Sequence, residues 1–222
     1  MKEIILDTET TGLSVKDGHR IVEIGCIELD NLVPTKNIFH CYLNPERKVS
    51  EKAFEVHGYS DQFLSDKKKF FEIADEFLNF IKDKKIIIHN AEFDISHLNN
   101  ELSIAGKPEI NKEHTVDTLD LARNKFPGSG ISLDALCKRF RIDNSKREKH
   151  TALIDCELLA KVYINLLDQK EPKLNFSNSV DINSVETQNK NITYSKKIVY
   201  PTSEELEQHR EFLKRDLKKN FY

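Results

Sequence analysis

Two carboxylates near the start of the chain, Asp7 and Glu9, follow the apolar run Ile4-Ile5-Leu6 and are separated by one residue. On a β-strand alternate side chains point to the same side, so both carboxylates would share one face. Carboxylates at the end of a buried strand are costly to desolvate unless a cation neutralises them, and Mg²⁺ and Mn²⁺ prefer oxygen ligands. The pair by itself does not distinguish a metal site from a solvated strand end.

A third carboxylate, Asp94, comes shortly after a predicted strand at Lys85–His89 and close to the start of a predicted helix at 93–105. Open α/β sheets bind their ligands at the carboxyl ends of strands, which favours a functional role. An acidic residue at a helix N-terminus is also stabilised by the helix dipole. Asp94 alone therefore leaves both interpretations open.

His150 and Asp155 form the last group of candidate residues. Five residues of helix rotate two side chains by about 140°, so this pair cannot share a helical face. We therefore expect His150 on a loop and Asp155 in the first turns of the helix that follows. Basic residues of the same loop, Lys146, Arg147 and Lys149, predict a mobile segment suited to phosphate. A lone histidine on a loop is usually a plain surface residue, and His150 is a candidate only because the carboxylates occur in the same sequence.

The elements that must position these residues follow from the apolar pattern. Three β-prone stretches with turn residues between them, at 3–8, 21–30 and 37–43, predict an antiparallel meander. Helical periodicity and short strands then alternate, at 70–82, 85–89, 93–105, 115–118, 119–126, 132–139 and 151–167. The predicted fold class is α/β, with a mixed five-stranded sheet flanked by helices.

Composition narrows the class of protein. The 222 residues are 38% hydrophobic and 32% charged, which is typical of a globular domain. A formal net charge of −3 gives no overall basic field, so any contact with nucleic acid must be local or must depend on metal ions. The apolar run before Asp7 is too short for a signal peptide or a membrane span, and we expect a cytoplasmic protein without a membrane partner.

Composition also predicts how the chain is divided. Residues 1–167 carry the predicted sheet and helices, whereas 168–197 are rich in polar residues and read as a flexible linker. In the tail at 198–222, Thr202 and Glu205 are spaced for a capping box. Apolar residues on one face of the helix that would follow are Leu206, Leu213 and Leu217.

Taken together, these residues resemble the three motifs of the DnaQ-like 3′→5′ exonucleases, in the subgroup (DEDDh) named for its five catalytic residues. The matching patterns are Asp-x-Glu, a later Asp after Asn-x-x-Phe, and His-x-x-x-x-Asp. The resemblance covers residues 1–167 and extends to Thr8, to Thr10–Leu13 and to Val56-His57-Gly58. It implies a ribonuclease H-like sheet, which agrees with the meander predicted from the pattern.

The resemblance also implies a mechanism with two divalent cations, Mg²⁺ or Mn²⁺. Asp7 would bridge both ions, Glu9 and Asp155 would hold the ion that binds the attacking water, and Asp94 would support the other. His150 would remove the proton from that water. Two cations supply the charge neutralisation that phosphodiester hydrolysis needs.

The substrate implied is a single-stranded or mispaired DNA 3′ end, because an unpaired base reaches the site without the cost of unstacking. The residues expected to contact it are Thr10, Thr11, Gly12, Leu13, His57, Asn90 and Phe93. His57 would serve equally well as a residue that caps a helix.

The expected function is proofreading within a replicative DNA polymerase, because the linker and tail resemble those of bacterial DNA polymerase III epsilon subunits. The tail would then bind the polymerase III alpha subunit, and Glu171–Phe176 resembles a sliding-clamp motif, although stray apolar residues in a linker would look the same. Two alternatives stay open. One is a DEDDh ribonuclease that trims RNA 3′ ends, and the other is a mainly structural tether between polymerase and clamp.

Overall fold

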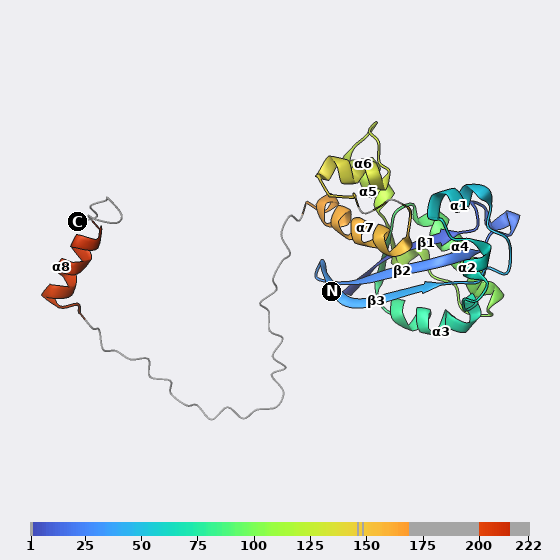
Figure 1. Ribbon diagram of the computed structural model, residues 1–222, viewed down its shortest axis with the longest axis horizontal. Coiled ribbons are helices and arrows are strands. Elements are labelled where there is room, and N and C mark those ends of the chain that lie inside the picture. Colours follow the sequence, from blue (N-terminus) through green and yellow to red (C-terminus); the bar gives the residue numbers. More distant parts are fainter. Residues whose placement is uncertain (1, 146, 148, 169–199, 214–222) are drawn as a thin grey trace, which may run out of the picture. The chain divides into compact units, whose positions relative to one another are not determined.

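The computed structural model describes residues 2–145, 147, 149–168 and 200–213. Its larger unit is built on a mixed sheet with the strand order β3-β2-β1-β4-β5 (Figure 1). The strands are β1 (Lys2–Thr10), β2 (Ile21–Asp30), β3 (Val33–Tyr42), β4 (Lys85–Ile88) and β5 (Thr115–Asp117). The first three form the predicted antiparallel meander, and β4 and β5 run parallel to β1. The predicted five-stranded sheet is thus confirmed, although β3 begins before residue 37.

The helices that surround this sheet match the predicted segments to within a few residues. They are α3 (Phe70–Ile81), α4 (Ala91–Ile104), α5 (Thr118–Lys125), α6 (Leu133–Phe140) and α7 (Ala152–Leu166), with 3₁₀ turns at Val15–Asp17 and Lys112–His114. Within the described part of the chain, no helix is long and apolar enough to cross a membrane.

Two further helices, α1 (Glu51–His57) and α2 (Asp61–Leu64), are absent from the sequence prediction. Both are too short for a helical period to be visible in the sequence. Each begins at a serine, Ser50 or Ser60, whose side chain accepts a hydrogen bond from the helix backbone. Serine is a favoured N-cap residue, so these two caps were the available signal.

Alternating residues of β1 divide the core into two layers. Ile4 and Leu6 pack on the side of α3 and α4, whereas Ile5 packs on the side of α5, α6 and α7. Because the period of a strand is two, Asp7 and Glu9 fall on the same side of the sheet as Ile5. The carboxylate pair therefore faces the layer that contains α7.

The first turn of α7 packs directly on the backbone of β2. Gly25 of β2 lies opposite Asp7 in the sheet, and Cys156 Sγ donates a hydrogen bond to its carbonyl oxygen at 3.2 Å. A Cβ atom at Gly25 would come within 2.7 Å of the Ala152 carbonyl carbon. A glycine at this position thus allows α7 to approach β1 closely.

The helix in the tail, α8 (Ser203–Phe212), belongs to a separate unit. Its predicted capping box is confirmed, because Thr202 Oγ1 accepts from Glu205 N and Glu205 Oε2 accepts from Thr202 N at 2.8 Å. Leu206 and Phe212 are about half exposed on this helix. The predicted linker core, the segment Glu171–Phe176 and Leu217 lie outside the described residues.

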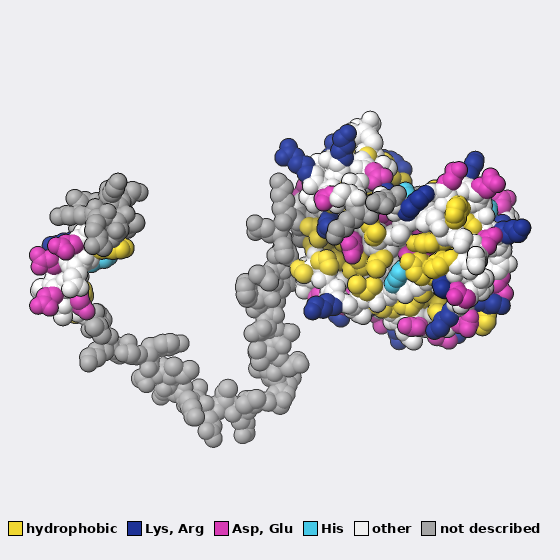
Figure 2. Space-filling model, viewed as in Figure 1, with side chains coloured by type: hydrophobic (Ala, Val, Ile, Leu, Met, Phe, Trp, Pro, Cys, Tyr) yellow, Lys and Arg dark blue, Asp and Glu magenta, His cyan; other side chains and the backbone are white. Residues whose placement is uncertain are grey.

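Charges of both signs are interspersed on the viewed face of the larger unit (Figure 2). Hydrophobic side chains gather near the middle of this face, with Lys, Arg, Asp and Glu around them. No continuous basic surface forms there, in line with the net charge of −3. Binding of nucleic acid on this face would therefore depend on local contacts.

We predict that Gly25→Ala lowers the free energy of unfolding by about 1–3 kcal/mol, the usual cost of forcing an extra methyl group into a packed interior. A strand glycine replaced by alanine would otherwise gain stability from its lower backbone entropy. Gly130→Ala is the matched control, because its new Cβ would meet only Ala135 Cβ, at 3.4 Å. Equilibrium denaturation of both variants measures the difference, and an unchanged or raised stability for Gly25→Ala would contradict the close packing.

Candidate active site

The five residues expected to perform catalysis line one pocket of about 200 Å³. Asp7 and Glu9 come from the end of β1, Asp94 from the first turn of α4, and Asp155 from the first turn of α7. His150 lies on the loop directly before α7, outside the helix as its spacing required. Residues from three distant parts of the sequence thus meet at the carboxyl ends of β1 and β4.

Asp94 is held against β1 by two hydrogen bonds from Thr8. Its Oδ1 accepts hydrogen bonds from Thr8 N at 3.0 Å and from Thr8 Oγ1 at 2.7 Å. Burial raises the pKa of Asp94 to about 7, against the lowering effect of these hydrogen bonds. The start of α4 is fixed by Asp117, whose carboxylate accepts from the backbone nitrogens of Asn90 and Ala91, each at 3.0 Å. Asp117 thus has a structural role at the start of α4.

Asp7 and Glu9 carry the strongest electrostatic strain in the pocket. Burial, followed by repulsion from Asp94 and Glu9, raises the pKa of Asp7 well above its usual value. Burial and repulsion from Asp155 and Glu23 raise the pKa of Glu9 to about 8. These carboxylates lack a neutralising charge of their own, so a bound cation would relieve the repulsion.

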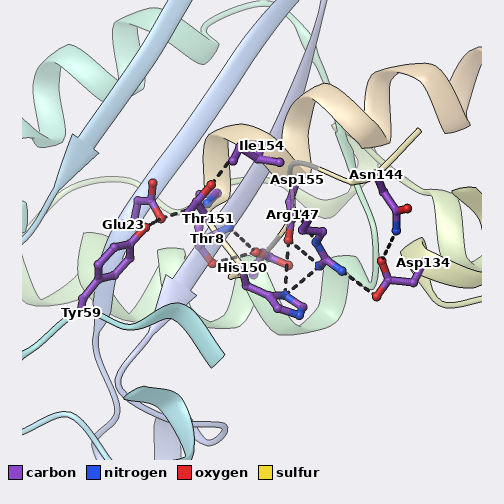
Figure 3. Close-up of polar contacts among 12 residues, drawn as sticks. Thr8, Glu23, Tyr59, Asp134, Asn144, Arg147, His150, Thr151, Ile154 and Asp155 are labelled. Carbon is purple, nitrogen blue, oxygen red and sulfur yellow. Dashed lines mark hydrogen bonds and ion pairs between the residues drawn. The ribbon is translucent and has the colours of Figure 1, made fainter. Parts of the chain in front are cut away.

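Asp155 differs from the other acids because it has a cationic partner. Burial alone would raise its pKa, but hydrogen bonds from His150 and Arg147 lower it below the usual value. Arg147 Nε donates to Asp155 Oδ1 at 2.5 Å and Nη2 donates to Oδ2 at 2.7 Å, which is a bidentate pair (Figure 3). The prediction of a mobile, phosphate-facing loop is wrong for Arg147, whose side chain is 7% exposed.

His150 and the start of α7 are anchored from two sides. His150 N donates to Val56 O at 3.2 Å, which ties the loop to α1. Glu23, buried on β2, accepts from Ala152 N at 2.9 Å and from the Tyr59 hydroxyl at 2.8 Å (Figure 3). Glu23 was missed in the sequence, where an acid between the apolar residues Val22 and Ile24 of β2 was its only signal.

Oxygen donors in this pocket fit a divalent cation. Glu9, His150 and Asp155 each offer one ligand atom, and these atoms all lie within 4.8 Å of one another. Asp7 and Asp94 add carboxylates from the same pocket. Carboxylates are the preferred ligands of Mg²⁺ and Mn²⁺, and Arg147 is the only Lys or Arg among the described residues that line this pocket.

A second cavity of about 500 Å³ adjoins Glu9 and contains most of the residues expected to contact substrate. Its lining includes Thr10, Gly12, Leu13, His57 and Phe93. Leu13 is 83% exposed, so its apolar side chain is accessible from this cavity. The two cavities are therefore suited to hold a nucleotide beside the carboxylates.

Two of the expected substrate residues lie elsewhere. Thr11 is fully buried, and its hydroxyl contacts His19 Nδ1 and Arg20 N, each at 3.0 Å. These hydrogen bonds stabilise the loop between β1 and β2, so Thr11 has a structural role. Asn90 lines the carboxylate pocket and adopts a left-handed backbone conformation, with φ 70°.

Both interpretations of His57 have structural support. The residue ends α1, and its Nδ1 accepts from Tyr59 N at 3.0 Å, as in a helix cap. Its ring also lines the larger cavity, and its buried Nε2 has no hydrogen-bond partner among the described residues.

Comparisons with known proteins agree with this geometry. The exonuclease family model matches residues 4–163. DNA polymerase III subunit epsilon of Rickettsia conorii is 50% identical over 224 residues, which cover 98% of this chain and 97% of that protein. The subunit of the same name from Escherichia coli is 46% identical over 171 residues, covering 73% and 70% of the two chains.

Solved structures give the same fold. Exonuclease X in complex with 5′ overhanging duplex DNA superposes with a TM-score of 0.58 at 26% identity, covering 75% of this chain and 92% of that one. The nuclease domain of 3′hExo, a DEDDh family member bound to rAMP, has a TM-score of 0.66 at 17% identity and covers 76% and 92%. The expected ribonuclease H-like fold is confirmed, and the chain belongs to the exonuclease family, among the relatives of the DNA polymerase III epsilon subunits.

Proposed function

We propose that this chain is a metal-dependent 3′→5′ exonuclease that hydrolyses single-stranded or mispaired DNA ends as the proofreading subunit of DNA polymerase III. The observation that carries the proposal is the pocket in which Asp7, Glu9, Asp94, Asp155 and His150 meet. The relatives named as epsilon subunits, and their similarity over almost the whole chain, support the assignment to the polymerase.

The exonuclease family uses divalent metal ions, and the donor set fits two of them, Mg²⁺ or Mn²⁺. Asp7 would contact both ions, Glu9 and Asp155 would hold one, and Asp94 would support the other. When bound, such ions neutralise charge on the phosphate and leaving oxygen and make a bound water more acidic. Thr8 keeps Asp94 turned toward this position through two hydrogen bonds.

His150 is assigned the removal of the proton from the attacking water. Its Nδ1 lies 3.4 Å from Asp155 Oδ2 and 2.7 Å from Arg147 Nη2. We therefore assign the proton transfer to Nε2, in the tautomer whose Nδ1 donates to Asp155 once Arg147 no longer contacts it. The side chain is 44% exposed, which allows the imidazole to pass the proton to solvent afterwards. Its loop is anchored to α1 and α7, so the imidazole is positioned before substrate arrives.

The larger cavity is assigned to the terminal nucleotide. Leu13 and Phe93 offer apolar surface to a base, and Gly12 lines the same cavity. A base enters such a cavity only after it has left its partner strand, which costs less at a mismatch. Preference for mispaired ends then follows without any reading of base pairing.

The ribonuclease alternative shares the catalytic motifs, and 3′hExo, which has the same fold, was solved with rAMP. At 17% identity this likeness concerns the fold alone. Its substrate is therefore no argument for RNA here. The tether alternative is disfavoured because it gives no reason for the converging acids.

The tail is assigned to polymerase binding. Thr202 and Glu205 cap α8, and Leu206, which is 45% exposed, belongs to the apolar face predicted with Leu213 and Leu217. Leu213 is buried, and Leu217 lies outside the described residues. An amphipathic helix of this kind typically docks in an apolar groove, here of the polymerase III alpha subunit. A tether through 168–197 would keep the exonuclease at high effective concentration near the primer end. Binding of the sliding clamp by 171–176 is part of the same proposal.

We predict that His150→Gln lowers kcat on end-labelled single-stranded DNA by about 10²–10⁴-fold, the usual contribution of a general base. Its Mn²⁺ affinity should change much less.

Asp7→Asn should lose both activity and Mn²⁺ binding, because it removes charge from the metal ligands. RNA of the same sequence is the parallel substrate. Faster cleavage of RNA than of DNA by the unaltered protein would contradict the proposed substrate, and wild-type turnover by either variant would contradict its assigned role.

We predict that the metal-free protein loses stability steadily as pH rises from about 4.5 to about 8 and that the loss levels off above this range. The folded pKa of Glu9 is about 8 and that of Asp94 about 7, both above their unfolded values, so the folded state binds more protons in this window. Its stability is therefore complete at low pH and falls as pH rises from the unfolded to the folded pKa values. Thermal unfolding in EDTA measures the slope, which Glu9→Gln should reduce and Mg²⁺ should suppress. An equal slope in the variant would argue against the shifted carboxylate.

We predict that a protein truncated after Leu167 hydrolyses free single-stranded DNA at almost the unaltered rate but no longer associates with the polymerase. The fold and the catalytic pocket lie within residues 1–167, whereas α8 carries the apolar surface for docking. Size-exclusion chromatography with the purified alpha subunit measures association. The full chain with Leu206→Asp keeps the length of the protein but places a charge on the proposed docking surface, so it should also associate more weakly. Undiminished binding by the truncated protein would show that the tail is not the tether.

A further inference from the structure

Arg147 lies between two carboxylates, one inside the catalytic pocket and one outside it (Figure 3). On the inner side its guanidinium forms the bidentate pair with Asp155, at 2.5 and 2.7 Å. On the outer side Nη1 donates to Asp134 Oδ2 at 2.7 Å. The motifs that predicted the other residues of the pocket do not include this arginine.

One guanidinium nitrogen already contacts Asp155, a residue assigned to hold a cation, and the neighbouring His150. Nη2 lies 2.7 Å from Asp155 Oδ2 and 2.7 Å from His150 Nδ1. These two residues, with Glu9, form the group whose ligand atoms lie within 4.8 Å of one another. A guanidinium and a divalent cation in contact with the same carboxylate repel each other, and burial strengthens the repulsion.

We propose, on the basis of the metal-dependent function proposed above, that Arg147 is a resident counter-ion that holds Asp155 in place until a cation displaces it toward Asp134. Arg147 is thus a positioning residue that competes with the metal for one carboxylate. A buried carboxylate without a partner is strongly destabilising, so the arginine keeps the metal-free pocket folded.

Asp134 is suited to receive the displaced arginine. It lies in the first turn of α6, its side chain is 56% exposed, and Asn144 Nδ2 donates to its Oδ1 at 3.0 Å. Arg147 already contacts Asp134, so the guanidinium can rotate away from Asp155 without losing every charged partner. Asp134 therefore lowers the cost of displacement and favours cation binding.

Substitutions of Arg147 and of Asp134 should consequently change the affinity for a cation in opposite directions. Removing the charge of Arg147 eliminates the competitor and should tighten binding of Mn²⁺. Removing the charge of Asp134 leaves Arg147 with Asp155 as its main partner and should weaken binding. A purely structural role for Arg147 would instead weaken cation binding in its variant, because Asp155 would lose its orientation.

The test measures free Mn²⁺ by electron paramagnetic resonance during titration of the full chain without DNA. We expect Arg147→Met to bind Mn²⁺ about tenfold more tightly, within the range typical of coupling between linked sites. Its metal-free unfolding temperature should fall, and Arg147→Lys should be intermediate. Asp134→Asn should bind Mn²⁺ more weakly. Arg123→Met removes one charge from an exposed ion pair with Asp120 and should change the affinity less than about twofold.

Asp134→Asn keeps the buried pair with Asp155 intact, so it provides a folded variant even if Arg147→Met unfolds. Unchanged or weaker Mn²⁺ binding by folded Arg147→Met would overturn the proposal, as would tighter binding by Asp134→Asn. Hydrolysis of single-stranded DNA by the unaltered protein is measured in parallel. Its absence would reject the proposed function, whereas intact hydrolysis with the wrong order of Mn²⁺ affinities would reject only the role of Arg147.

Discussion

Repulsion among buried carboxylates is the constraint on which the catalytic pocket depends. Asp7, Glu9 and Asp94 all have raised pKa values because folding removes water from them and brings them together. Asp155 has a lowered pKa because Arg147 and His150 donate hydrogen bonds to it. Among the described residues of the pocket, the guanidinium of Arg147 offsets only part of the negative charge of the four carboxylates. A divalent cation would neutralise the remainder.

The scaffold tolerates this repulsion because its core is apolar on both sides of the sheet. Ile4 and Leu6 anchor one layer and Ile5 the other, all with almost no exposed area. Burial of each such side chain contributes roughly 1.5–3 kcal/mol, which allows a few strained carboxylates at the strand ends. Charge repulsion is therefore confined to the carboxyl ends of β1 and β4, where ligand binding relieves it.

Helix starts determine the geometry of the site more directly than the strands do. Asp117 accepts hydrogen bonds from the first residues of α4, and Glu23 accepts one from Ala152 at the start of α7. Gly25 removes the side chain that would keep α7 away from β1. These residues lie far apart in the sequence, but together they place Asp94 and Asp155 within reach of Asp7.

Local patterns in the sequence were enough to predict the sheet and most of the helices, and they made the five residues of the pocket candidates. Strand periodicity put Asp7 and Glu9 on one face, and helical rotation excluded His150 from the helix that carries Asp155. Both are properties of the backbone over a few residues, so they can be read without knowledge of the fold. The resemblance to a known family then connected motifs that periodicity alone could not bring together.

The partners of these residues were decided by tertiary structure. Arg147 looked like one of several basic loop residues, and Glu23 looked like a stray acid in an apolar strand. Their roles depend on contacts with Asp155 and with the start of α7, which only the packing of that helix across β1 and β2 creates. The sequence by itself thus determined which side chains are candidates for the chemistry, whereas tertiary structure decided which charges compensate them, because electrostatic compensation depends on distance through space.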